Sequence, residues 1–158
     1  MQVRRATTDD RTFIAEVVVG EFASTKVVSR GRVHEDASQL DGFVVENDGR
    51  PIGCALWYEV DGDAELVAIA TTYRGAGAGT ALLDAVVEHA RSSNWSRLWL
   101  ITTNDNTDAL RLYQRAGWDW VGWYRDAVTD ARSLKPELPL GGAHGIPIRH
   151  ELELEYPL

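Results

Sequence analysis

The stretch YRGAGAGTALL, residues 73–83, places glycine at every second position between an arginine and a helix-forming run. Glycine weakens regular structure, so three alternating glycines predict a loop whose backbone adopts unusual dihedrals or touches a partner closely. The preceding residues, AELVAIATT, have the pattern of a strand. A strand, a glycine loop and a helix in this order present free backbone N–H groups at the positive end of a helix dipole, which favours phosphate binding. A turn that packs the helix against the strand would need the same glycines.

Two familiar nucleotide-binding motifs do not match this loop. In the dinucleotide motif G-x-G-x-x-G, counted from Gly75, Thr80 stands where the third glycine is required. A P-loop ends in Gly-Lys-Ser/Thr, and no lysine lies between Tyr73 and Lys135. Binding of NAD or ATP is therefore a weak explanation of the loop.

Strand and helix patterns alternate along the rest of the chain. We expect strands over 1–7, 42–48, 51–60, 64–72, 97–103, 118–126 and 148–156, helices over 13–23, 80–93 and 106–116, and a loop with a short helix over 24–36. The Asp48-Gly49 pair predicts a hairpin turn. No repeat or low-complexity block interrupts this order, so residues 1–158 predict a single α/β domain with a mixed sheet flanked by helices.

Charge and composition exclude several functional classes. The 158 residues include 24 Asp and Glu against 16 Lys and Arg, a net charge of −8, whereas nucleic-acid binding needs clustered cations. No apolar run is long enough to span a bilayer, and MQVRRATTDD lacks the apolar core of a signal peptide, so we expect no membrane partner. The single cysteine, Cys54, lies in an apolar stretch, which predicts a small core residue in a cytoplasmic protein.

A second motif supports the interpretation of the glycine loop as a phosphate-binding site. Asn106 precedes TDALRLY, and Tyr113 follows seven residues later, about two helical turns away on the same side. Taken together, ELVAIATTYRGAGAGTALL and NTDALRLYQRAGW closely resemble the two signature motifs of the GNAT family of acyl-CoA-dependent N-acyltransferases. The order of the predicted elements is similar to that family across almost the whole chain.

The resemblance implies a coenzyme A site in a largely antiparallel sheet that splays apart. Ile69 and Thr71 match strand positions whose backbone pairs with the pantetheine arm, and Asn106 matches a residue that hydrogen-bonds this arm. The pyrophosphate cradle is matched by Arg74, Gly75, Ala76, Gly77, Ala78, Gly79 and Thr80. Thr71 replaces a frequent proline, and Ala76 stands where a basic residue is common, so we expect phosphate contacts to depend on backbone amides and Arg74.

The implied reaction is direct transfer of an acetyl group from acetyl-CoA to a primary amine of a small molecule or peptide. Tyr113 matches the general acid near the thioester sulfur, and a phenol of pKa ~10 can protonate a thiolate locally. Glu65 is the first choice of general base, ahead of Asp63, because it lies deeper in the strand. Three alternatives stay open: a related acyl donor, a hydroxyl acceptor, and a noncatalytic coenzyme A-binding or regulatory module on the same fold.

Several other groups have open roles. His144 and His150, with Asp130, Glu151 and Glu153, match no compact zinc motif, so we predict no metal. The Pro- and Gly-rich connection at 126–146 is expected to close over the acceptor site, its alternatives being a surface loop or a dimer contact.

The loop at 24–36 and the aromatic residues near 118–124 carry further expectations. His34 faces either the acceptor pocket, together with its loop, or solvent. Trp118 and Trp120 are expected on one face of a strand, and Trp123 and Tyr124 on opposite faces. These aromatics line an acceptor pocket, pack in the core, or form a patch covered by a second copy in a homodimer.

Overall fold

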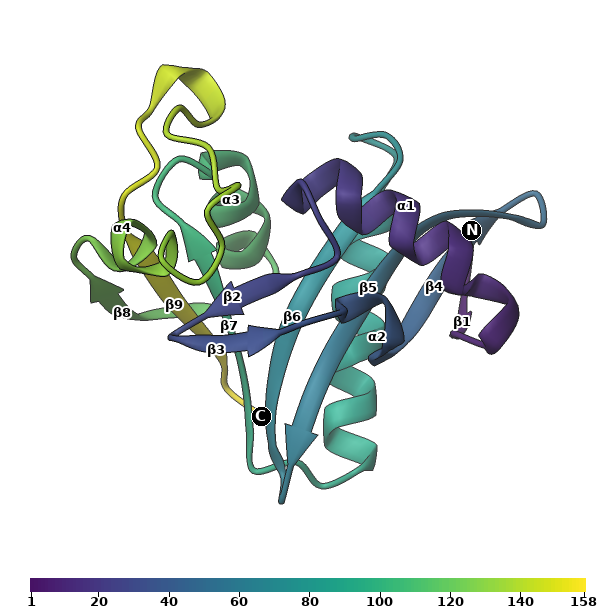
Figure 1. Ribbon diagram of the computed structural model, residues 1–158. Helices are drawn as coiled ribbons and strands as arrows, with labels where there is room; N and C mark the ends of the chain where they lie inside the picture. Colours follow the sequence, from purple (N-terminus) through teal and green to yellow (C-terminus); the bar gives the residue numbers. More distant parts are fainter.

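A mixed seven-stranded sheet forms the centre of the computed structural model, which describes residues 1–158 (Figure 1). The strands lie in the order β1-β4-β5-β6-β7-β9-β8, and every neighbouring pair is antiparallel except β6 and β7. Their bounds are β1 Gln2–Arg5, β4 Asp41–Asn47, β5 Arg50–Val60, β6 Asp63–Thr71, β7 Arg97–Thr103, β8 Asp119–Tyr124 and β9 Glu151–Tyr156. The predicted fold class, a mixed and largely antiparallel sheet flanked by helices, is confirmed.

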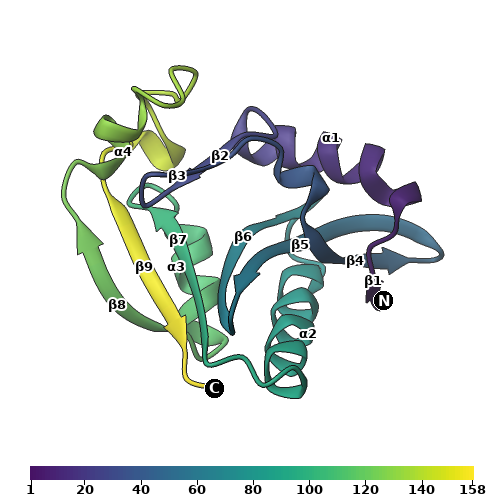
Figure 2. The same cartoon turned by 60° about the horizontal axis from the view of Figure 1, so that its bottom comes forward.

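Helices cover the two faces of the sheet (Figure 2). Two hydrophobic clusters result from the alternation of side chains along the strands. Val44 belongs to the cluster that includes residues of α1 (Arg11–Phe22), whereas its neighbour Val45 belongs to the cluster that includes residues of α2 (Ala78–Ser92) and α3 (Thr107–Arg115). On α2 the buried residues recur at helical spacing, at Leu82, Leu83, Val86, Val87 and Ala90. No helix combines the length and apolar character needed to cross a membrane.

The parallel strands β6 and β7 stay paired over a short stretch only. Their register includes Asp63↔Arg97, Ala64↔Leu98 and Glu65↔Trp99. Beyond Glu65, β6 continues to Thr71 against β5, while β7 continues to Thr103 against β9. The sheet therefore opens between the carboxyl-terminal halves of β6 and β7, which is the splay that the family resemblance implied.

The expectation for residues 24–36 was wrong in part. Instead of a loop with a helix, β2 (Val27–Ser29) and β3 (Arg32–His34) form a separate hairpin, and a 3₁₀ helix follows at Ala37–Gln39. Arg30 and Gly31 both have positive φ, 49° and 75°, as a two-residue hairpin turn requires. Figure 1 shows this hairpin crossing the face of the sheet over β6 and β7.

The aromatic residues near β8 also differ from expectation. Trp118 is buried in the core, whereas Trp120 and Trp123 are about half exposed. The strand begins only at Asp119, and its register shifts after Trp120, so strict alternation does not hold through this segment. A short helix, α4 (Ala127–Ala131), follows β8, and a 3₁₀ turn, Ala143–Gly145, comes before β9.

Candidate active site

A cavity of about 940 Å³ lies where β6 and β7 separate. Its walls come from the end of α1, from β2, the second half of β6, the glycine loop, the start of α2, β7, α3 and the connection between β8 and β9. Most segments of the two sequence motifs therefore line the same cavity.

The three glycines of the loop serve two different purposes. Gly75 and Gly77 have φ of +86° and +80°, a region that side chains rarely adopt, and Gly77 is the N-cap of α2. A Cβ at Gly75 would meet nothing within 4 Å, so open space adjoins the loop there. At Gly79, by contrast, a Cβ would lie 3.2 Å from Leu112 Cδ2 on α3. Gly79 therefore serves helix packing, whereas the positive φ of Gly75 and Gly77 and the open space at Gly75 are compatible with the predicted phosphate cradle.

The other residues matched to coenzyme A binding lie around the same space. Ile69 and Thr71 line the cavity on β6, beyond its last pair with β7, so one edge of their backbone faces the opening. Asn106 lines it at the N-terminus of α3, where its Oδ1 accepts a 3.4 Å hydrogen bond from the Ala109 amide. The side chain of Asn106 thus caps the helix as well as facing the cavity.

Arg74, at the start of the glycine loop, already has a partner. Its Nη1 lies 3.0 Å from Asp108 Oδ2, and His144 Nε2 lies 3.1 Å from the same oxygen. The His144 hydrogen bond, aided by the charges of His144, Arg74 and Arg111, lowers the pKa of Asp108. The carboxylate beside the cradle was not found by sequence reasoning, because α3 and the loop are distant in the chain. A bound phosphate would have to compete with Asp108 for Arg74.

Tyr113 is buried on α3 and lines the cavity. Its ring centroid lies 6.2 Å from that of Trp118, so the side chain is part of the core as well. Burial, with a smaller contribution from the charge of Glu21, raises the pKa of the phenol above its usual value. The hydroxyl is therefore held in its protonated form, as a proton donor must be.

Glu65 is almost fully buried, at 2 % exposure, beneath the β2–β3 hairpin. Its Oε2 lies 3.4 Å from His34 Nε2 and 3.9 Å from Arg32 Nη1. Neither Glu65 nor His34 is among the residues that line the cavity. Asp63, the other carboxylate considered, accepts a 2.6 Å hydrogen bond from Trp99 Nε1 at the far end of the strand.

A different carboxylate, Glu151, does line the cavity. It begins β9 opposite Thr103 and lies on the same face of the sheet as Glu65, because Trp99 and Thr103 share that face. Arg30 binds it twice, from its backbone N at 3.2 Å and from Nη1 at 3.3 Å. Sequence reasoning considered Glu151 only as a metal ligand, and no group of three or more His, Cys, Asp or Glu side chains suited to a metal ion occurs.

The connection between β8 and β9 spans the cavity from α1 to α3. Lys135, 2 % exposed, donates from Nζ to the carbonyls of Phe22 at 2.7 Å and Lys26 at 2.6 Å. On the other side, the Ala143 amide donates to Asp105 Oδ2 at 3.0 Å. Residues of the connection, Val128, Ala131, Leu138, Pro139 and Ile148 among them, line the cavity between these anchors. The segment is therefore an ordered wall of the cavity.

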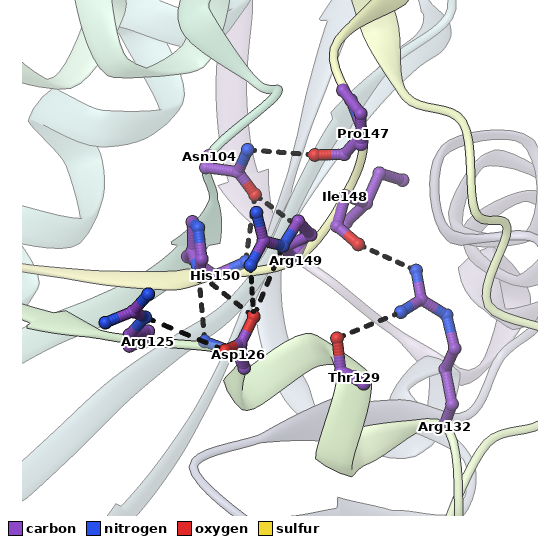
Figure 3. A network of polar contacts seen from close by, with 9 residues as sticks. All are labelled: Asn104, Arg125, Asp126, Thr129, Arg132, Pro147, Ile148, Arg149 and His150. Atoms are coloured by element: carbon purple, nitrogen blue, oxygen red, sulfur yellow. Dashed lines mark hydrogen bonds and ion pairs between the residues drawn. The ribbon is translucent and has the colours of Figure 1, made fainter.

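The two ends of this connection are tied together where the chain enters β9 (Figure 3). Asn104 Oδ1 accepts hydrogen bonds from the amides of Arg149 and His150, both at 2.9 Å. Asp126, just before α4, accepts from Arg149 and donates its own amide to His150 Nδ1 at 2.9 Å. These contacts fix the direction in which β9 starts, and hence the position of Glu151.

The sequence model of the acetyltransferase (GNAT) family matches residues 9–118. The chain belongs to the acetyltransferase (GNAT) family. It is 42 % identical over 116 residues to the uncharacterized protein YdhI of Bacillus subtilis (strain 168), covering 72 % of each chain. Among solved GNAT folds, it is similar to a GNAT family acetyltransferase from Elizabethkingia anophelis with acetyl-CoA bound, with a TM-score of 0.71, 18 % identity and coverage of 99 % and 97 %. It is also similar to a ribosomal-protein-alanine N-acetyltransferase from Brucella melitensis, with a TM-score of 0.71, 18 % identity and coverage of 100 % of both chains.

Proposed function

We propose that this protein is an N-acetyltransferase that transfers the acetyl group of acetyl-CoA directly to a primary amine of a small molecule or peptide. One observation carries the proposal: the cavity between the separated strands β6 and β7 joins the glycine loop to Tyr113. Membership of the acetyltransferase family supports the reaction class. The neighbour solved with acetyl-CoA supports this donor, and the ribosomal-protein-alanine N-acetyltransferase supports an amine as acceptor.

The residues of the cradle suit a coenzyme A donor. The pyrophosphate would bind the free amides of the loop at 74–80 and the N-terminus of α2, where the helix dipole favours negative charge. The pantetheine arm would follow the unpaired edge of β6 at Ile69 and Thr71, near Asn106. Acetyl-CoA supplies an activated acyl carbon, which an amine attacks more readily than an ordinary amide or carboxylate.

Side chains of the protein would then accept and donate the protons of the reaction. An amine like that of lysine has a pKa of ~10.4, so it must lose a proton before it can attack. Tyr113, protonated and within the cavity, would donate a proton to the sulfur that leaves. A base at Glu65, as expected from the sequence, would have to reach the amine through a bridging water, because neither Glu65 nor its neighbour His34 lines the cavity.

A noncatalytic coenzyme A-binding module is the second candidate on this fold. The two functions separate when the protein and acetyl-CoA are incubated with amines of different class, such as spermidine, phenethylamine and an alanine-initiated peptide, and products are measured by mass spectrometry. Acetylated product that falls at least tenfold in Tyr113→Phe supports catalysis. Tight acetyl-CoA binding with no product from any amine would favour the binding module.

A cytoplasmic location and a homodimer are further proposals. The cytoplasmic location is supported by the single thiol, Cys54, which is a poor candidate for a disulfide because it is buried and burial raises its pKa to about 12.

The homodimer is supported by Trp120, Val121 and Trp123, each about half exposed on the edge strand β8. Light scattering of the wild type and of Trp123→Glu tests the dimer: a dimer that the variant dissociates supports it, and a monomeric wild type rejects it.

A further inference from the structure

The side of the cavity covered by the β2–β3 hairpin holds a hydroxyl group without a partner. Ser29 is 3 % exposed, its Oγ is buried without a hydrogen bond, and the residue lines the cavity. Ser29 and Val27 are both buried on β2, so both side chains face the sheet. A buried hydroxyl of this kind costs free energy unless a ligand satisfies it.

Glu151 lies near Ser29, because Arg30, which follows Ser29 in the chain, donates its backbone N–H to Glu151 Oε2 at 3.2 Å. A carboxylate has about four acceptor positions, and Arg30 uses two of them. The remaining ones, together with Ser29 Oγ, form a small polar site within the wall of the cavity.

The other carboxylates on the cavity wall are less suited to hold a substrate amine. Asp105 is engaged by the Thr103 hydroxyl and the Ala143 amide. Asp108, whose side chain is 41 % exposed, is engaged by Arg74 and His144 at the phosphate end, and Glu21 is exposed on α1. Asp105 is also covered by Gly142, where a Cβ would lie within 3 Å of its carboxylate, whereas buried Glu151 is bound by a single residue, Arg30, which leaves room for an ammonium group.

We propose that Glu151 takes the proton of the acceptor's ammonium group, that Ser29 Oγ holds the same nitrogen, and that the acceptor is a primary amine carried on an apolar group. The inference rests on the proposed function. The apolar part of the acceptor is indicated by the neighbouring wall, where Val27, Ile101 and Val128 line the cavity. A long polycation would find no second free carboxylate in this buried part of the wall.

The electrostatic surroundings suit a base. Burial raises the pKa of Glu151, Arg30 lowers it, and the charge of Glu65 on β6 raises it further. From β8, Tyr124 lies opposite Glu151, and the Arg30 guanidinium carbon is 3.4 Å from the centre of its ring. The charged and titratable groups around Glu151 thus include Arg30, Glu65 and Tyr124, together with Glu153, which lies on the same face of β9 and accepts a hydrogen bond from the Tyr124 hydroxyl.

Glu151 and Tyr113 together carry the protons of the reaction. One ammonium proton moves to the Glu151 carboxylate, which later releases it to water. The freed nitrogen lone pair forms the bond to the acyl carbon while the carbon–sulfur bond breaks. Tyr113 gives its proton to the sulfur and recovers one, through water, from the nitrogen that becomes the amide. The products are the acetylated amine, the thiol and one proton.

The test compares Glu151→Gln with Glu65→Gln and, as a matched control, Glu153→Gln, which lies on the same face of β9, binds Arg97 and does not line the cavity. Transfer from acetyl-CoA to phenethylamine is measured from pH 6 to 9.5. In parallel, phenethylamine hydrochloride is titrated calorimetrically at pH 7 into each protein saturated with CoA. Glu151→Asp, which keeps the charge, replaces Glu151→Gln if the latter does not fold by circular dichroism.

Glu151→Gln should lower kcat/KM at least 100-fold at pH 7, and the deficit should shrink about tenfold per pH unit as the free amine becomes available. The control Glu153→Gln should lose less than tenfold, Glu65→Gln should lose less than Glu151→Gln, and phenethylamine binding should be lost only in Glu151→Gln. If Glu151→Asp has to be used, a loss of more than tenfold, or of phenethylamine binding, supports the inference.

Several results would overturn it. These are a Glu151 variant as active as the wild type, or a deficit that does not change with pH. If the wild type acetylates no amine, the proposed function fails, and phenethylamine binding that depends on Glu151 would still support the ammonium site. Transfer to spermidine but not to phenethylamine would reject the apolar acceptor.

Discussion

Replacing Lys135 by methionine would release the connection that forms one wall of the cavity. The ammonium group donates to two backbone carbonyls, of Phe22 at 2.7 Å and of Lys26 at 2.6 Å, and the residue is 2 % exposed. Hydrogen bonds from a charged donor contribute about 1.5–3 kcal/mol each, and the desolvation of the buried ammonium offsets part of this sum. Methionine fills a similar volume but leaves both carbonyls without a donor, so we expect a loss of about 2–3 kcal/mol.

Urea unfolding followed by circular dichroism measures the free energy of unfolding, with Glu137→Gln as control. Glu137 belongs to the same connection, and its contact with Ser24 is long, 3.4 Å, and exposed. Its charge also favours the Lys135 ammonium, so the Glu137→Gln variant should lose less than about 1 kcal/mol. Limited proteolysis should cut Lys135→Met between residues 132 and 146 earlier than the wild type. A Lys135→Met protein as stable as the control and cut no faster would refute the anchoring role.

Three further predictions address the cradle and the fold. Ala76→Lys should bind acetyl-CoA a few-fold more tightly in calorimetry than Ala76→Glu, since Ala76 is exposed on the phosphate loop; equal affinities would contradict this. The free energy of unfolding of Gly79→Ala should stay within about 1 kcal/mol of the wild type, because the end of the Leu112 side chain can move into the cavity. A larger loss in thermal unfolding would show that Leu112 cannot move. The hydrogen bond from Arg4 holds the pKa of Asp10 in the folded protein well below its ordinary value. The contact with Arg4 therefore stabilises the fold fully when the pH is above the ordinary pKa of an aspartate, and this stabilisation is lost as the pH falls from there towards the lowered pKa. Urea midpoints between pH 5 and 2 should fall more steeply for the wild type than for Asp10→Asn, and parallel curves would argue against the pair.

The parts of the fold that the sequence predicted are those specified by short-range signals. Positive φ at Gly75 and Gly77 and the Asp48-Gly49 hairpin follow from turn chemistry within a few residues. The apolar face of α2 follows from its period. The opening between β6 and β7 came from the resemblance to a family, because periodicity does not show where two strands part.

What the sequence did not predict depends on contacts between distant segments. Glu151 reaches the cavity because β9 inserts between β7 and β8, and the β2–β3 hairpin then brings Arg30 onto it. The two strands of that hairpin have only three residues each, too short for alternation to stand out. The contacts of Asp108 with Arg74 and His144 likewise join three elements that are separate in the chain.

The most direct test of the account is a calorimetric titration of the purified protein with acetyl-CoA, beside titrations with NAD and ATP. A cavity built from the glycine loop, the free edge of β6 and the start of α3 predicts one site per chain for acetyl-CoA, with much weaker or no binding of the two nucleotides. Absence of acetyl-CoA binding, or preference for NAD or ATP, would contradict the proposed function at its first step.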